Sequence, residues 1–276
     1  MNVIRVFPRR TKLTPTDSYA FVGDPPLWLP EADRVHVSCT FTWDKPEALR
    51  LVGAWSQHYM HVWLGGPQYG MGSDFTPGMY VREGITFTSR GCNNQCPFCL
   101  VPEMEGKLRT IPITLGHTIN DNNLLQTGRE HMSKVFQMLK SQRKAATFGG
   151  GLQASLVDDW VAEELRGLRI DQLFLAADTI GALKPLKKAV GKLSFLPRRK
   201  LRCYVLIGFQ GETIEQAKDR LEQIWEIGCM PFAQLYQPPD KFIEYSEAWK
   251  WLNREWCRPA AMVAMHQKVG YSCRLE

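Results

Sequence analysis

Three closely spaced cysteines are the residues of this sequence most able to do chemistry. Cys92, Cys96 and Cys99 stand within eight residues, in the segment Cys-Asn-Asn-Gln-Cys-Pro-Phe-Cys. Thiolates are ligands that suit zinc and iron–sulfur clusters. Because a single loop can bring all three thiols to one centre, the spacing predicts a metal site.

The number of ligands bears on which metal is bound. Structural zinc usually takes four protein ligands, and neither a fourth cysteine nor a histidine lies near this loop in the sequence. A four-iron cluster held by three cysteines leaves one iron open to a further ligand. The alternative is a zinc loop completed by a distant residue, such as Cys203, Cys229, Cys257 or Cys273.

Short, apolar, β-rich runs recur along the chain and would position this loop. They start about thirty residues apart, the length of a strand, a crossover helix and two loops. The runs are 85–88, 117–119, 146–148, 173–176, 203–207 and 232–236. The cysteines follow the first run, through the turn Ser89-Arg90-Gly91. In parallel β/α barrels, sites lie at the carboxyl ends of the strands.

Helical patterns lie between these runs. One apolar stripe has helical spacing and consists of Met132, Val135, Phe136 and Leu139. Ser155 indicates a second helix start, and Thr213 with Gln216 forms a capping box that opens a third. Alternating strands and helices predict an α/β fold with a parallel sheet. Six units favour a partial (β/α)6 TIM-like barrel, although a flat, doubly wound sheet has the same periodicity.

Smaller elements flank the six units. Residues 34–66 have a strand–helix–strand pattern, and this βαβ-like piece is too small to be stable alone. The tail carries three tryptophans and has the pattern of a helix with an irregular end. We therefore expect an N-terminal βαβ-like extension (1–80), the partial barrel (81–240) and a C-terminal helical tail (241–276).

The motif C-x-x-x-C-x-x-C, with an aromatic residue before its last cysteine, resembles the signature of the radical S-adenosylmethionine (SAM) superfamily. Here the aromatic residue is Phe98, and the motif follows the first strand of a six-unit barrel. The lead-in Thr88-Ser89-Arg90-Gly91 looks most like the branch that contains methylthiotransferases and cobalamin-associated members. The resemblance covers about residues 83–240.

The resemblance implies a four-iron, four-sulfur (4Fe-4S) cluster on Cys92, Cys96 and Cys99, with SAM bound at the open iron. The reduced cluster would pass one electron to the sulfonium, and the resulting 5′-deoxyadenosyl radical would abstract a hydrogen atom from the substrate. A one-electron reductant such as flavodoxin or ferredoxin is the implied partner.

Further positions are similar to the SAM-binding motifs of the superfamily. The glycine-rich turn that contacts the methionine amino group corresponds to Gly149, Gly150 and Gly151 at the end of the third strand. Ile207 and Gly208 resemble the fifth-strand motif that packs on adenine. Asp178, just past the fourth strand, is the acid best placed for a ribose hydroxyl, with a helix cap as the alternative.

Two differences separate the chain from particular branches. The N-terminal piece looks like the trailing half of the Rossmann-type domain of cobalamin-associated members, and the half with the D-x-H-x-x-G motif is missing. We therefore expect no cobalamin. No β-barrel RNA-binding module follows residue 240, which weakens a tRNA methylthiotransferase assignment.

Polar residues near the mouth of the expected barrel are candidates for substrate contact. Four follow the second strand, where turns also favour such residues: Asn120, Asp121, Asn122 and Asn123. Three charged residues follow the cysteine loop and fit either an anionic group or an exposed turn: Glu105, Lys107 and Arg109. His117 is more typical of a core histidine than of a catalyst.

The composition and the first residues of the chain indicate where in the cell the protein is expected. The 276 residues are 44% hydrophobic and 22% charged, with no long apolar window, so we expect neither disorder nor a membrane span. The first residues lack the apolar core of a secretory signal, which predicts a cytoplasmic protein. In a reducing compartment, metal binding or catalysis is favoured over a disulfide framework for the eight cysteines.

The distribution of basic residues along the chain indicates a class of substrate. The net charge is +6, and a run without acids contains Lys184, Lys187, Lys188, Lys192, Arg198, Arg199, Lys200 and Arg202. Because such a run can contact phosphates, a nucleotide or nucleic acid is the leading substrate hypothesis, with a small metabolite or peptide as its rival. The hypothesis from another class is a zinc-stabilised, non-catalytic binding module.

Overall fold

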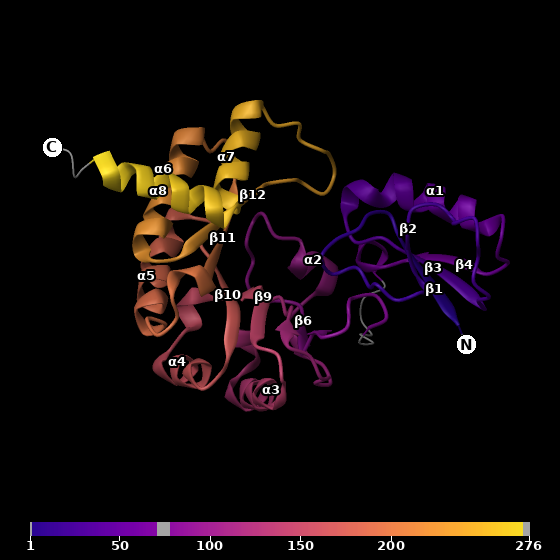
Figure 1. The fold of residues 1–276 in the computed structure, drawn as a ribbon, viewed down its shortest axis with the longest axis horizontal. Coiled ribbons are helices and arrows are strands. Elements are labelled where there is room, and N and C mark those ends of the chain that lie inside the picture. The colour runs from indigo at the N-terminus through magenta and orange to yellow at the C-terminus, as the bar shows by residue number, and fades with distance from the viewer. Residues whose placement is uncertain (1, 71–77, 273–276) are drawn as a thin grey trace.

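Two parallel β-sheets organise the chain. A computed structural model describes residues 2–70 and 78–272. A four-stranded sheet near the N-terminus lies at the right of Figure 1, and a six-stranded sheet with most of the helices lies at the left. The α/β fold with parallel strands is therefore confirmed.

The N-terminal sheet has the order β2-β1-β3-β4 and is parallel throughout. Its strands are β1 (Val3–Phe7), β2 (Ala20–Val22), β3 (Arg34–Ser38) and β4 (Val62–Gly65). Helix α1 (Lys45–Ser56) packs on one face, where its Leu51 and Trp55 meet Val35 and Val37 in a buried cluster. The expected strand–helix–strand piece corresponds to β3, α1 and β4, and the sheet is larger than expected because β1 and β2 precede it.

The six-stranded sheet follows chain order, β5-β8-β9-β10-β11-β12, and every neighbouring pair is parallel. Its strands are β5 (Ile85–Thr86), β8 (Thr118–Ile119), β9 (Ala146–Leu152), β10 (Ile170–Ala176), β11 (Leu201–Ile207) and β12 (Met230–Leu235). Each lies where the sequence predicts a strand. The order nowhere reverses, unlike the order of a doubly wound sheet.

Helices connect and follow these strands. They are α3 (Arg129–Ser141), α4 (Asp159–Arg166), α5 (Leu183–Lys192), α6 (Ile214–Ile227), α7 (Glu247–Cys257) and α8 (Pro259–Ser272). The predicted stripe of α3 is buried, and the capping box of Thr213 and Gln216 is present. The predicted start at Ser155 is wrong, because the N-cap of α4 is Asp158, whose carboxylate accepts the N–H of Val161.

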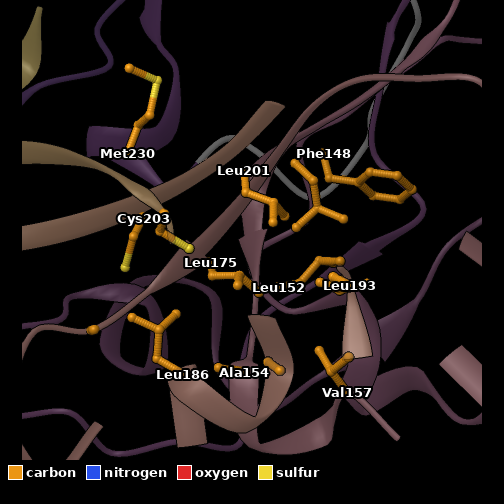
Figure 2. Packing of buried hydrophobic residues seen from close by; sticks show 14 of the residues in the cluster. Phe148, Leu152, Ala154, Val157, Leu175, Leu186, Leu193, Leu201, Cys203 and Met230 are labelled. Carbon is orange, nitrogen blue, oxygen red and sulfur yellow. The ribbon is translucent and has the colours of Figure 1, made fainter. Parts of the chain in front are cut away.

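The main core lies between the six-stranded sheet and its helices. Figure 2 shows side chains of β9, β10 and β11, including Phe148, Leu175 and Leu201, packed with Leu186 of α5. Cys203 lies in the same core and is fully buried, and burial raises the pKa of its thiol well above the ordinary value. Because alternate strand residues face the helices, the intervening residues face the opposite side of the sheet.

Candidate metal centre at the carboxyl edge of the six-stranded sheet

The cysteine loop, residues 91–100, follows β5 and the short strand β6 (Ser89–Arg90). It leads into α2 (Val101–Glu105) and β7 (Arg109–Thr110), which pairs antiparallel with β6. Gly91 opens the loop with a φ of +78°, and a Cβ there would lie 2.3 Å from the carbonyl oxygen of Lys107. Glycine is required at this position, because both the conformation and the close approach exclude a side chain.

The Asp178 carboxylate lies close enough to the cysteine loop to act on two of its three thiols. Cys92, Cys96 and Cys99 are free and half-buried. Burial raises the pKa of Cys96 and of Cys99, and the nearby thiols and the Asp178 carboxylate raise both further. Within residues 2–70 and 78–272, no three His, Cys, Asp or Glu side chains are grouped so as to hold a metal ion.

Four side-chain amides form a hydrogen-bonded group beside Cys92, and we call Asn94, Asn123, Gln126 and Gln153 the amide cluster. Asn94 N–H and Asn123 Nδ2 lie 3.4 and 3.7 Å from the Cys92 sulfur as donors. Gln153 Oε1 accepts from the other three amides at 2.8–3.0 Å. Gln126 Oε1 accepts from the backbone N–H of Asn93 at 2.9 Å and from the Cys92 thiol at 3.8 Å. Gln126 and Gln153 were not among the residues predicted from the sequence, although both follow strands that end at this edge.

The candidate substrate residues after β8 bind their own chain. Asp121 is 1% exposed and accepts hydrogen bonds from Thr88 and Ser89, so it holds the segment that leads to the cysteines. Burial raises the pKa of Asp121, although these hydrogen bonds oppose the shift. Asn122 Nδ2 donates to Glu105 at 2.7 Å. Asn120 lies beside β9, where its Oδ1 would be 3.2 Å from a Cβ on Gly149.

Glu105, the last residue of α2, holds the beginning of the cysteine loop. Its carboxylate pairs with Arg90 at 2.6 Å and accepts the Gly91 N–H at 3.1 Å. Arg109 donates to the Glu105 carbonyl oxygen at 2.7 Å, and the Lys107 side chain is exposed. Glu105 and Arg109 therefore brace the loop.

The three glycines of β9 lie inside the strand and not in a turn after it, because β9 continues to Leu152. A Cβ on Gly150 would lie 1.9 Å from the Asp121 carbonyl oxygen, so the end of β8 crosses directly over this residue. The Gly149 carbonyl oxygen accepts the Tyr204 hydroxyl at 2.7 Å. Gly151 faces the Tyr204 ring.

The remaining candidate SAM-binding residues lie at the ends of β10 and β11. Asp178 Oδ1 accepts the Leu206 N–H at 2.8 Å, and burial raises the pKa of this carboxyl. Gly208 N–H donates to Glu212. The Ile207 side chain is fully buried in the core and its carbonyl oxygen accepts the Tyr236 N–H, so the structure gives Ile207 a supporting position in the strand.

Aromatic rings join the cysteine loop to the far strands of the sheet. Phe98 meets Phe209, just after β11, edge-on with centroids 5.5 Å apart. Phe209 in turn meets Tyr236, just after β12, at 4.8 Å. The structure thus brings Phe98 against the segment that follows β11.

Several basic residues lie away from this edge or bind their own chain. Residues 198–202 precede or begin β11 and so lie at the amino ends of the strands. Arg202 is buried between the rings of Phe174 and Phe232. Lys200 donates to the Ile170 carbonyl oxygen, and Lys192 pairs with Asp159. His117, before β8, also lies at the amino end and packs against Gly84.

The fold and the site define an α/β protein with a cysteine-bearing loop at the carboxyl edge of a six-stranded parallel sheet. No known protein-family model matches the chain. In the described part of the chain, none of the helices has both the length and the apolar character needed to cross a membrane.

Proposed function

We propose that this chain is a radical SAM enzyme built on a partial (β/α)6 barrel. The observation that carries the proposal is the position of three free thiols on one loop, directly after the first of six parallel strands in chain order. The carboxyl ends of the other strands bring Asp178, the β9 glycines and the amide cluster to the same edge. Catalytic sites of β/α barrels are assembled at this edge.

The donor set fits a 4Fe-4S cluster. Cys92, Cys96 and Cys99 would hold it, since thiolates are its usual ligands and all three thiols are unpaired. In a cluster each thiolate binds a different iron atom, so the three sulfurs must surround one cluster and need not lie within bonding distance of a single ion. When bound with one open iron, such a cluster supplies the electron that cleaves SAM and yields a 5′-deoxyadenosyl radical.

The residues around the loop would bind and orient SAM. Gly149 and Gly151 present backbone groups without side chains, which suits the amino and carboxylate groups of the methionine part. Asp178 offers a carboxylate for a ribose hydroxyl, and Phe98 offers a ring face for the adenine. Gly208 follows the strand beside Asp178, and its N–H is held by Glu212.

The chain must also keep the reactive atoms apart from water. Phe98, Phe209 and Tyr236 form a continuous row of rings from the cysteine loop to the end of β12. Apolar rings beside a radical intermediate exclude water and competing hydrogen donors. This row is the part of the site best suited to that task.

The placement of the basic residues favours a small metabolite or peptide over a nucleic acid as substrate. Arg202 is buried, Lys192 and Lys200 bind their own chain, and residues 198–202 lie at the amino ends of the strands. A nucleotide or nucleic acid is the second candidate, carried by the exposed Lys184, Lys187 and Lys188 of α5. We propose flavodoxin or ferredoxin as electron donor and a reducing, cytoplasmic location, in keeping with the free thiols.

Anaerobic reconstitution with iron and sulfide tests the proposal. We expect a brown protein that contains iron and sulfide and that forms 5′-deoxyadenosine from SAM on reduction. Cys96→Ala should lose both the cluster and the product. Stoichiometric zinc without 5′-deoxyadenosine would contradict the proposal and favour a zinc-stabilised binding module.

A salt titration separates the two substrate classes. Binding to RNA or DNA that falls steeply as salt rises would favour a nucleic acid, because phosphate contacts release counterions. The absence of binding at low salt would leave the small metabolite or peptide. Transfer of deuterium from labelled candidate substrates into 5′-deoxyadenosine would then identify the hydrogen abstracted.

A further inference from the structure

One backbone donor fixes the orientation of the whole amide cluster. The N–H of Asn93 donates to Gln126 Oε1 at 2.9 Å, so this atom must be the amide oxygen. The NH2 group of Gln126 then points to the other side. There it donates to Asn94 Oδ1 at 2.9 Å and to Gln153 Oε1 at 3.0 Å.

The orientation of the Gln126 amide in turn fixes the orientation of the other three amides. Because Asn94 Oδ1 accepts from Gln126, its NH2 group is the one that lies 3.0 Å from Gln153. Gln153 Oε1 is thus an acceptor, and its own NH2 group donates to Ser155 at 2.9 Å. Asn123 approaches the same oxygen to 2.8 Å and can do so only with its NH2 group.

The fixed orientation aims an Asn123 N–H at the Cys92 sulfur. Asn123 Nδ2 lies 3.7 Å from that sulfur. The other end of the amide, Oδ1, is buried and has no hydrogen-bond partner in the part of the chain that the structure describes. Leaving a buried acceptor unpaired costs about 1–3 kcal/mol. A neutral thiol is a weak acceptor, whereas hydrogen bonds to an ionised group are about twice as strong, so the arrangement suits a metal-bound thiolate.

We infer that Asn123 is a positioning residue that donates a hydrogen bond to the Cys92 thiolate and raises the reduction potential of the cluster bound there. The inference rests on the proposed function and concerns the same site. Reduction adds negative charge to the cluster and its sulfur ligands. A nearby N–H dipole stabilises that charge, and hydrogen bonds to sulfur are among the factors that set cluster potentials. Removal of the donor therefore makes the cluster harder to reduce.

A redox titration of the reconstituted full-length protein, followed by electron paramagnetic resonance, tests this inference. Asn123→Leu removes the donor at similar size, and for it we expect the reduced-to-oxidised ratio at a fixed potential to fall about tenfold, which is about 59 mV for a one-electron couple. Asn123→Asp removes the donor and also places a carboxylate beside the sulfur, so its potential should fall at least as far.

Asn94→Ala is the matched control. The Asn94 side chain belongs to the same cluster and binds Gln126 and Gln153, but the donor that Asn94 offers to the sulfur is its backbone N–H. This variant should keep the wild-type potential even where it retains less iron. If both Asn123 variants kept the wild-type potential, the inference would be overturned and the proposed function would stand. A shift in Asn94→Ala as large as that in the Asn123 variants would have the same meaning. A wild-type protein that takes up no iron and sulfide would overturn the proposed function together with it.

Discussion

The Asp121 carboxylate accepts two hydrogen bonds from Thr88. One oxygen accepts the Thr88 backbone N–H and the other its hydroxyl, each at 2.6 Å. Thirty-three positions separate the two residues in the chain. The contact ties the end of β8 to the segment between β5 and the cysteine loop, so the base of the loop is fixed by a buried side chain.

Asp121→Asn should destabilise the protein and do so in a pH-dependent way. The NH2 group of an amide cannot accept a hydrogen bond, whereas both oxygens of a carboxyl group can, whether it is charged or protonated. This difference predicts a loss of about 1–3 kcal/mol in the free energy of unfolding. Burial raises the folded-state pKa of Asp121 above its ordinary value of 3.8. The stabilisation by Asp121 is then complete below the unfolded pKa and declines as the pH rises through the folded pKa. Denaturant titrations of both proteins from acid to neutral pH measure the difference.

The exposed Asp171 provides a control for that experiment. Asp171→Asn should change the free energy of unfolding by no more than about 0.5 kcal/mol, as surface substitutions usually do. The advantage of the wild type over Asp121→Asn should be greatest at acid pH. An advantage that grows as the pH rises would contradict the assignment.

Gly150→Ala should disrupt the contact between β8 and β9. The new Cβ would lie 1.9 Å from the Asp121 carbonyl oxygen, and only a backbone shift can relieve that clash. We expect a loss of about 1–3 kcal/mol or more in the free energy of unfolding. Gly191→Ala is the matched substitution in α5, where a Cβ meets nothing within 4 Å. It should stabilise the helix by about 0.5–1 kcal/mol. Equal stabilities of the two variants would show that the strands do not approach this closely.

Glu212→Gln should remove a buried ion pair at the end of β11. Glu212 lies 2.5 Å from Arg220, whose side chain is 4% exposed. Removing one partner leaves the other charge buried, at a cost of about 3–5 kcal/mol. The exposed pair of Glu163 and Arg166 provides the comparison. Glu163→Gln should cost less than about 1 kcal/mol. Chemical denaturation measures both, and similar losses would mean that the Arg220 charge is solvated in solution.

Substitutions of the cysteines should fall into two sets according to how much iron and sulfide the reconstituted protein retains. Cys203→Ala and Cys257→Ser should keep the iron and sulfide content of the wild type after reconstitution, because Cys203 is buried in the core and Cys257 ends α7. Cys96→Ala should lose both. Circular dichroism controls for folding. Loss of iron in a folded Cys203→Ala protein would indicate that a distant cysteine completes the site.

Much of the large sheet is predictable from sequence because it depends on local patterns. The strands of the six-unit region are apolar runs, and the stripe of α3 has helical spacing. Strand β1 is harder to predict because Arg5 interrupts its apolar pattern. Arg5 is 8% exposed and is accommodated by its ion pair with Asp17, which depends on the folded chain.

The site is predictable in part for the same reason. The spacing of Cys92, Cys96 and Cys99 is local, and so is their position after the first strand. The roles of Asp121 and Gln153 are not local, because each depends on donors that lie about thirty positions or more away in the chain. The position of a polar residue just after a strand therefore predicts that it lies at the carboxyl edge of the sheet. Whether it contacts a ligand or holds a loop depends on its hydrogen-bond partner in the folded chain.

The sequence by itself determined the parallel α/β fold and the gathering of three thiols on one loop, because both follow from the order and spacing of neighbouring residues. Only the tertiary structure decided which polar groups hold the cysteine loop. It also decided that residues 198–202 lie at the amino ends of the strands, opposite the loop. Hydrogen bonds and ion pairs form between groups that are close in space. For this site, such groups come from strands far apart in the chain.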